Sequence, residues 1–413
     1  MKTKVYLVGP MLTRSGYGEQ ARFAMRALRS REDLFDIYMQ PLHWGQTSWI
    51  PFYDEEKAWV DQTIEKTIGY LQQGGEFDVS VQVTIPNEWK KITPINVGYT
   101  AGIESTKVSH EWIQAVNQMD KVIVVSSHSK QVFENTTYTG IDEATRQEVK
   151  LACQTDIEVV NYPVKKYDKI EPLELDVAPN INFLSVAQWG PRKNVTNMIK
   201  WFVEEFHDEE VGFIIKTNQS KNSLMDREFC EGQLKAHLKP YPERKCSVYM
   251  VHGDMTDEEM HALYTNEKVS AFVGIPHGEG FGLPFFESAY SGLPVVATGW
   301  SGQLDFLVDE KHQEHFYNVS FDIRPIQDES VWENILIRES GWAYAREDSY
   351  KEQLRQCYND VTNNTGHVAD ACEYASALHE RFEESKMYAQ FVEAMGLQID
   401  HEWADTLAQV EIL

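Results

Sequence analysis

Residues 278–287 read Gly-Glu-Gly-Phe-Gly-Leu-Pro-Phe-Phe-Glu, and this stretch decides how the rest of the chain is interpreted. Glycines surround Glu279, and Pro284 begins a predicted helix whose first turn carries Glu287. A glycine loop that opens a helix presents free backbone N–H groups and the positive end of the helix dipole, so it favours an anion. The neighbouring carboxylates would repel phosphate and bind hydroxyls instead. The stretch therefore predicts a ligand that carries both phosphates and sugar hydroxyls.

Length, charge and cysteine content exclude several classes of protein. The chain has 413 residues, of which 42% are hydrophobic, so it can form two or three domains with real cores. Its net charge of −26 argues against nucleic acid as a general partner and against a broad basic membrane surface. No apolar run reaches the length of a membrane span, no signal peptide is apparent, and the five scattered cysteines indicate reduced thiols. These features predict a cytoplasmic protein with no transmembrane segment and at most peripheral membrane contact.

Short apolar strands alternate with helical patterns in the first part of the chain, which predicts a parallel sheet of the doubly wound α/β class. The opening unit is a strand at 4–9, a turn with Gly16 and Gly18, and a helix over 19–28. Such a glycine loop faces ligands at the carboxyl end of its strand, although a plain tight turn is the simpler alternative. Further strands are predicted at 36–39, 78–83, 95–99, 121–125 and 157–160.

The segment 171–180 contains two prolines and lacks periodicity, so it reads as a linker between domains. The strand and helix alternation then begins again, and the chain beyond residue 321 is mostly helical in pattern. This organisation predicts one Rossmann-like domain over 1–178, a second over 179–385, and a helical segment over 386–413. Strands of the second domain are predicted at 182–186, 211–216, 247–251, 271–275 and 294–297.

Arg192 and Lys193 follow the first strand of the second domain, where a loop leads into a helix. Two cations at the carboxyl edge of a sheet suit a diphosphate, because Arg binds oxygens as a fork and Lys acts as a point charge. A solvated basic pair is the plain alternative, and Lys216 at the end of a later apolar run is a weaker candidate. Two glutamates eight positions apart also occur by chance. Glu279 and Glu287 are singled out by their context, namely the glycines around Glu279, the apolar Phe281 and Leu283, and the helix start at Pro284.

Taken together, these residues resemble a known pattern. Glu279 and Glu287 resemble the Glu-x7-Glu signature of the family-4 retaining glycosyltransferases (glycosyl transferases group 1), which have the GT-B fold. Residues 192–194 resemble the phosphate-binding basic motif of that family, and residues 16–18 resemble its first glycine loop. The resemblance covers roughly residues 1–390, and the Glu-x7-Glu block is its most specific part.

The resemblance implies two Rossmann-like domains that face each other across a cleft, with the acceptor on the first domain and a nucleotide sugar on the second. Glu279 would contact the hydroxyls of the donor sugar, and Glu287 would hold the ribose. Arg192 and Lys193 would neutralise the leaving diphosphate, so these two cations and Glu279 are the predicted catalytic residues. The remaining predicted donor-binding residues are Gly280, Phe281, Gly282, Leu283, Gly16 and Gly18.

The sequence departs from the family pattern in two places. An additional Arg often precedes the Lys of the basic motif, whereas residues 187–189 here read Ala-Gln-Trp. The family often carries a histidine after the fourth strand of the first domain, whereas residues 99–104 here read Tyr-Thr-Ala-Gly-Ile-Glu. Either Glu104 takes over a polar role there or His110 reaches in from the following helix.

The expected reaction is retaining transfer of a hexosyl group from a UDP-, GDP- or ADP-sugar to a glycan or another hydroxyl acceptor. No cofactor and no metal are expected, because Asp305 and Asp309 are isolated and no His-x3-His motif occurs. Two alternatives stay open at this point. One is a GT-B sugar-nucleotide epimerase or phosphorylase, and the other is a catalytically silent protein that binds a nucleotide sugar.

Overall fold

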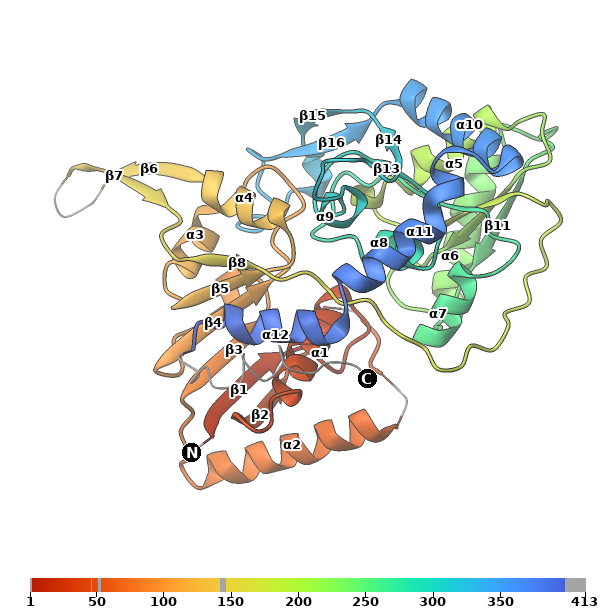
Figure 1. The fold of residues 1–413 in the computed structure, drawn as a ribbon. Coiled ribbons are helices and arrows are strands. Elements are labelled where there is room, and N and C mark those ends of the chain that lie inside the picture. The colour runs from red at the N-terminus through yellow and green to blue at the C-terminus, as the bar shows by residue number, and fades with distance from the viewer. Residues whose placement is uncertain (1, 46, 51–52, 142–145, 398–413) are drawn as a thin grey trace.

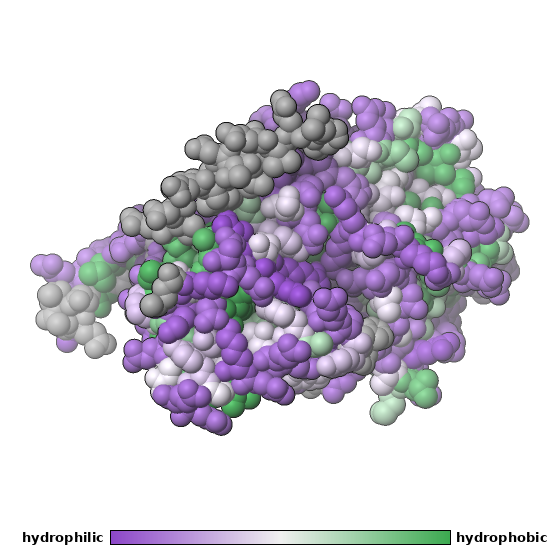
Figure 2. Space-filling view, turned by 60° about the horizontal axis from the view of Figure 1, so that its bottom comes forward, coloured by the Kyte–Doolittle hydropathy of each residue, from purple (hydrophilic) through white to green (hydrophobic). Residues whose placement is uncertain are grey.

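A computed structural model of the chain describes residues 2–45, 47–50, 53–141 and 146–397. It contains two separate six-stranded sheets with flanking helices, which confirms the predicted pair of Rossmann-like units (Figure 1). Most of the face shown in Figure 2 is hydrophilic, in keeping with the strongly acidic composition. None of the helices in the described part of the chain is long and apolar enough to cross a membrane.

The sheet of the first domain is parallel and has the order β2-β1-β3-β4-β5-β8. β3 is buried throughout and β4 is buried beyond Ile95, as expected for a sheet covered on both faces, whereas β1 has three buried residues among seven. The order reverses between β1 and β3, so the loops after these central strands open a ligand crevice at the carboxyl edge. The strands are β1 (Thr3–Gly9), β2 (Phe35–Pro41), β3 (Val79–Val83), β4 (Ile95–Thr100), β5 (Lys121–Val124) and β8 (Ile157–Val159).

The sheet of the second domain repeats this plan with the order β11-β10-β9-β12-β13-β14. All five pairings are parallel, and the order reverses between β9 and β12. The loops after β9 and β12 therefore meet at the switch point, and these are the loops that carry Arg192 and Glu279. The strands are β9 (Asn182–Val186), β10 (Gly212–Lys216), β11 (Ser247–Val251), β12 (Ala271–Gly274), β13 (Val295–Thr298) and β14 (Tyr317–Val319).

The helices connect and cover the sheets, and most begin with a capping side chain; Thr256, for example, forms a capping box with Glu259 at the start of α7. The helices are α1 (Gly16–Arg29), α2 (Glu55–Gln72), α3 (His110–Val116), α4 (Ser127–Asn135), α5 (Val195–Glu205), α6 (Leu224–Leu238), α7 (Asp257–Tyr264), α8 (Leu283–Tyr290), α9 (Leu304–Leu307), α10 (Glu347–Asn363), α11 (Gly366–Arg381) and α12 (Glu384–Ala394).

Two antiparallel hairpins were not predicted from the sequence. One joins β6 (Thr137–Ile141) to β7 (Glu148–Ala152), and the other joins β15 (Phe321–Pro325) to β16 (Gly341–Ala345). The expectation of mostly helix beyond residue 321 is therefore wrong for 321–345. Residues 321–325 are half-buried or exposed and carry charges, so they lack the apolar run by which the other strands were recognised.

The last described helix returns to the first domain, where α12 packs along α1 (Figure 1). The ring of Phe391 lies 5.5 Å from that of Phe23 in α1 and 5.1 Å from that of Tyr99 in β4, measured between centroids. One continuous apolar core then extends through Phe286 of α8 into the second domain. The segment predicted at 386–413 falls outside the described residues from 398 onward, and the domain boundaries at 178 and 385 stay predictions.

Phe391→Ala should lower the free energy of unfolding by about 3–5 kcal/mol, because it empties a fully buried aromatic site that joins α12 to α1. Urea unfolding followed by circular dichroism measures this loss. Met225→Ala is the control, since Met225 is 81% exposed and its truncation should change the free energy by no more than about 0.5 kcal/mol. Equal effects of the two substitutions would contradict the role given to α12.

Candidate functional site

Three charged side chains meet at the switch point of the second sheet. The loop after β9 forms a short 3-10 turn over Pro191–Lys193, and the loop after β12 carries Glu279. Lys193 Nζ lies 2.5 Å from Glu279 Oε1, and Arg192 Nη1 lies 3.2 Å from Glu279 Oε2. Arg192 Nη1 also donates to the carbonyl oxygen of Gly278 at 2.6 Å. The structure thus brings the predicted residues Arg192, Lys193 and Glu279 into one group.

This group is buried, and its charges depend on one another. Burial opposes the charged form of Glu279, but Lys193 and Arg192 outweigh burial and lower the pKa of its carboxyl. Burial lowers the pKa of Lys193, with a smaller contribution from Arg192, while Glu279 opposes this shift. Glu279 is only 5% exposed, so its negative charge is tolerated because two cations contact it.

The loop after β13 fixes the backbone of Glu279. The N–H of Glu279 donates to Ser301 Oγ at 2.9 Å, and the N–H of Gly302 donates to the Glu279 carbonyl at 3.0 Å. Ser301 has a left-handed backbone with φ of 80°, and its hydroxyl donates to Gln303 Oε1. A Cβ on Gly302 would lie 2.1 Å from the carbonyl oxygen of Gly280, so only glycine fits there. Glu279 therefore occupies a position fixed from two loops.

The glycine loop at 278–282 lies directly against the first domain. A Cβ on Gly278 would lie 2.5 Å from the carbonyl oxygen of Glu104, and a Cβ on Gly280 would lie 2.8 Å from that of Ala101. The Ser126 hydroxyl donates to the carbonyl oxygen of Gly280 at 2.5 Å. These glycines have two roles: they allow the backbones of the two domains to approach closely, and they allow the loop to present backbone N–H groups to a ligand. The sequence alone indicates only the second role, because the first depends on which segment of the other domain lies opposite.

The structure distinguishes between Glu104 and His110, the two candidates for the polar position at which the family often carries a histidine. Glu104 Oε1 lies 3.2 Å from Arg192 Nη2, so a carboxylate of the first domain joins the charged group of the second. His110 is the first residue of α3, is exposed, and lies against the ring of Tyr138 with centroids 6.0 Å apart. Of the two, Glu104 is the residue that contacts the group.

The other predicted residues lie at neighbouring positions. Gly16 and Gly18 form the first turn of α1, so this helix begins three residues earlier than predicted, with Ser15 Oγ accepting from the N–H of Gly18. Lys216 lies at the end of β10, where its Nζ donates to the Gly253 carbonyl at 2.6 Å, apart from the Glu279 group. Phe281 directs its ring into the core, 4.9 Å from that of Phe306, so only its backbone is available to a ligand.

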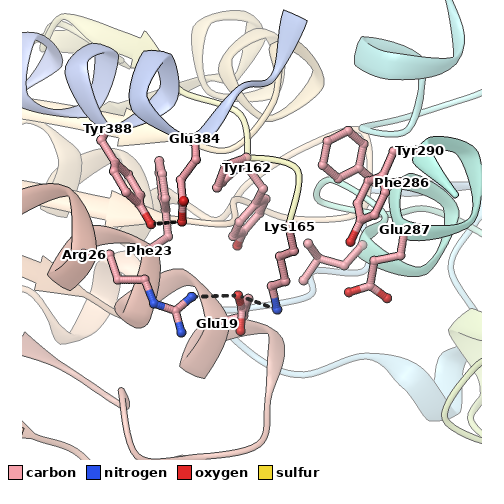
Figure 3. Close-up of a pocket in the computed structure, with 12 residues that line it drawn as sticks. Glu19, Phe23, Arg26, Tyr162, Lys165, Phe286, Glu287, Tyr290, Glu384 and Tyr388 are labelled. Carbon is pink, nitrogen blue, oxygen red and sulfur yellow. Dashed lines mark hydrogen bonds and ion pairs between the residues drawn. The ribbon is translucent and has the colours of Figure 1, made fainter. Parts of the chain in front are cut away.

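Glu287 lines a cavity between the domains (Figure 3). Its Oε2 accepts a hydrogen bond from the Tyr264 hydroxyl at 3.0 Å, and burial raises the pKa of Glu287 to about 7 although Lys165 attracts the charged form. Figure 3 shows Lys165 turned toward Glu19 of α1, and the Lys165 Nζ to Glu19 Oε1 distance is 2.9 Å. Among the described residues, no cation contacts the Glu287 carboxyl directly, because the nearby Lys165 pairs with Glu19 instead.

A second polar cluster was missed because its members are not adjacent in sequence. Ligand atoms of Asp226, Cys230 and His252 lie within 4.8 Å of one another. His252 Nε2 lies 2.8 Å from Asp226 Oδ1, and three backbone N–H groups over 219–221 also donate to the Asp226 carboxylate. Because these donors already satisfy its oxygens, the cluster is explained as an anchor for the loop at 219–221.

Ser126 and His128, which lie at the start of α4, are two further residues of the interface that the sequence analysis did not single out. The edge of the His128 ring faces Trp300 at 4.8 Å, and burial lowers the pKa of His128 to about 4. Ring carbons of Trp300 in turn lie beside Gly278. No pattern within α4 indicates these contacts, because their partners come from the other domain.

No protein-family model and no curated protein sequence matches the chain. Solved structures do match it. The sucrose-phosphate synthase of Thermosynechococcus elongatus gives a TM-score of 0.58 at 11% identity, with 98% of this chain and 100% of that chain covered. A glycosyltransferase from Rickettsia africae gives 0.58 at 12% identity, with 95% and 98% covered.

The Anabaena protein HepE, solved in complex with UDP and glucose, gives a TM-score of 0.58 at 14% identity, with 95% of this chain and 99% of that chain covered. Identities this low show the fold alone. The likeness extends over nearly the whole chain and confirms the predicted GT-B architecture of two facing Rossmann-like domains.

Glu287→Gln should stabilise the protein at pH 8 and leave its stability nearly unchanged at pH 4. The ordinary pKa of 4.5 rises to about 7 on folding, so the wild type loses stability as the pH rises through this window, and the loss is complete above it. Thermal unfolding at the two pH values measures the effect, which is expected to be a few degrees at pH 8.

The matched control is Glu267→Gln, since Glu267 is exposed at the surface of the same domain. The melting temperature of that variant should equal that of the wild type at both pH values. A Glu287→Gln variant that is less stable than the wild type at pH 8 would contradict the burial argument.

Proposed function

We propose that this chain is a retaining glycosyltransferase, which moves a hexosyl group from a UDP-, GDP- or ADP-sugar to a hydroxyl of a glycan or another acceptor. The observation that carries this proposal is the group formed by Arg192, Lys193 and Glu279 at the switch point of the second sheet. The fold supports it, because the similar structures include a named glycosyltransferase and a complex with UDP and glucose.

The demanding step is separation of charge, because the bond from the anomeric carbon to the diphosphate breaks and negative charge grows on the leaving phosphate. A fork-shaped guanidinium and a point-charge ammonium, both fixed in position, match that charge. Each fixed donor of this kind can supply on the order of 3 kcal/mol to the transition state. In this proposal Arg192 and Lys193 act on the diphosphate, and Glu279 accepts hydrogen bonds from the hydroxyls of the sugar.

The same three residues explain how the donor would be accommodated. Arg192 contacts both Glu279 and Glu104, so its charge is already balanced by carboxylates from the two domains. A bound diphosphate would replace part of these contacts and leave Glu279 with acceptor capacity for sugar hydroxyls. The donor therefore supplies both the anion and the hydroxyls that this group requires.

The first domain contacts the loop that carries Glu279, so an acceptor bound on the first domain would lie next to the donor. The glycine loop of the second domain lies on residues 101–104 of the first, and Arg14 Nη1 lies 3.0 Å from Asp254 Oδ1 across the same crevice. We assign the acceptor to the first domain (1–178) and the donor to the second (179–385), with Glu287 toward the ribose and Gly16, Gly18 and residues 280–283 along the diphosphate and sugar. Contact this close excludes water, which limits hydrolysis of the donor.

The stereochemistry and the absence of a cofactor belong to the proposal as well. The acceptor would attack from the face that the diphosphate leaves, and the departing phosphate would take the acceptor proton, so configuration is retained. Arg192 and Lys193 supply the positive charge for this step, so we propose no metal. The five free cysteines fit a reducing compartment, and we place the enzyme in the cytoplasm.

Lys193→Ala and Glu279→Ala should each reduce transfer by a factor of about 100 or more, because each removes a charge aimed at the reacting groups. The assay is release of nucleoside diphosphate from UDP-, GDP- and ADP-glucose with a panel of glycan acceptors. Circular dichroism should show an unchanged fold. Lys200→Ala is the matched control, since Lys200 is exposed on the adjacent helix α5, where it pairs with Glu204 of the same helix.

Turnover at the wild-type rate in either site variant would refute the proposal. Incubation of the donor without an acceptor tests the related chemistries. An epimer of the nucleotide sugar, or a sugar phosphate formed with added phosphate, would indicate an epimerase or a phosphorylase instead. Binding of a donor with no product on any acceptor would indicate a silent binding protein.

A further inference from the structure

We propose that the acceptor is an uncharged sugar, and that Tyr17 and Trp44 form the platform on which its ring lies. This inference rests on the proposed transferase function and names the acceptor class for that same site. The rings of Tyr17 and Trp44 lie against each other with centroids 4.3 Å apart and planes tilted by 32°, and both residues are partly exposed. Tyr17 follows β1 and Trp44 follows β2, so both lie at the carboxyl edge of the first sheet.

The platform lies on the acceptor side of the charged group. The Tyr17 hydroxyl is 2.8 Å from Thr100 Oγ1, at the end of β4. The chain then continues directly into residues 101–104, which contact the glycine loop and place Glu104 on Arg192. The aromatic pair is therefore separated from the Glu279 group only by this short segment.

The two loops that carry the platform are tied together. Arg14 N donates to the Ser48 carbonyl at 2.8 Å, Ile50 N donates to the Leu12 carbonyl at 2.9 Å, and Thr13 pairs with Trp49 in an antiparallel bridge. Trp49 is itself 46% exposed. Flat aromatic faces that stay in contact with water suit the apolar C–H face of a sugar ring, while polar groups nearby bind its hydroxyls.

The charges around the platform favour an uncharged acceptor over a phosphorylated one. Burial is the main cause that raises the pKa of the Tyr17 hydroxyl, and the carboxylates of Glu104 and Glu88 add to this shift. The cations on the adjoining part of α1 and its loop are engaged, since Arg14 contacts Asp254 and Arg22 contacts Glu19 at 2.8 Å. An acceptor phosphate placed on Tyr17 would therefore meet like charges first.

Saturation-transfer NMR and titration with a panel of neutral para-nitrophenyl hexosides, with and without UDP, test the platform. Glucose 6-phosphate is the charged probe. At least one neutral hexoside should bind, and glucose 6-phosphate should bind about 10-fold more weakly or worse. Trp44→Ala should weaken hexoside binding by about 10-fold, whereas Trp44→Phe keeps a ring and most of the affinity. UDP affinity should be the same in all variants.

Trp59→Ala is the matched control. Trp59 is a partly buried tryptophan of the same domain, on α2, and its ring packs under Arg29 of α1. It should bind the hexosides like the wild type. The inference is overturned if no neutral hexoside binds, if glucose 6-phosphate binds as tightly as the best hexoside, or if Trp44→Ala binds like the wild type. A wild type that binds none of UDP, GDP and ADP would instead refute the proposed transferase. The hexoside comparison made without nucleotide tests the platform independently of that result.

Discussion

The contact on which this structure depends is that of the buried Glu279 carboxylate with Arg192 and Lys193. A carboxylate that is almost fully buried is stable only when cations and hydrogen-bond donors surround it. The two cations come from the loop after β9 and the carboxylate from the loop after β12, so the reversal of strand order between these strands is what makes the contact possible. The loop after β13 then fixes the backbone of Glu279 through Ser301.

The same contact links the two domains. Glu104 reaches Arg192 from the first domain, and the glycines beside Glu279 allow the backbones of both domains to approach closely. Packing of α12 on α1 and the ion pair of Lys165 with Asp257 of the second domain also hold this arrangement. Glu287 shows that the arrangement has a cost in stability, since its carboxyl is buried with a raised pKa. Groups with a strongly shifted pKa are concentrated at functional sites, and this is why the proposal places Glu287 toward the ribose.

Much of this could be predicted from the sequence, because buried parallel strands are short apolar runs and the loops at their carboxyl ends converge. That reasoning located the first sheet, five of the six strands of the second sheet, and the group of Arg192, Lys193 and Glu279, but it missed the short edge strand β14. It could not pair Glu104 with Arg192, or Ser126 with Gly280, because those contacts join distant segments and depend on how the domains dock. It also missed β15, whose half-buried or exposed residues include charges and lack the apolar signal, and its partner β16, a short buried strand within a segment interpreted as helical.

The most direct test of the central claim is calorimetric titration of UDP and UDP-glucose into the wild type, Lys193→Ala and Glu279→Gln. If Lys193 holds the diphosphate, Lys193→Ala should weaken both ligands by about 10-fold or more. If Glu279 competes with the diphosphate for the two cations, Glu279→Gln should bind UDP at least as tightly as the wild type does. If Glu279 also holds the sugar, the wild type should bind UDP-glucose more tightly than UDP, and Glu279→Gln should bind the two equally. Unchanged affinities of Lys193→Ala for both ligands would contradict the account.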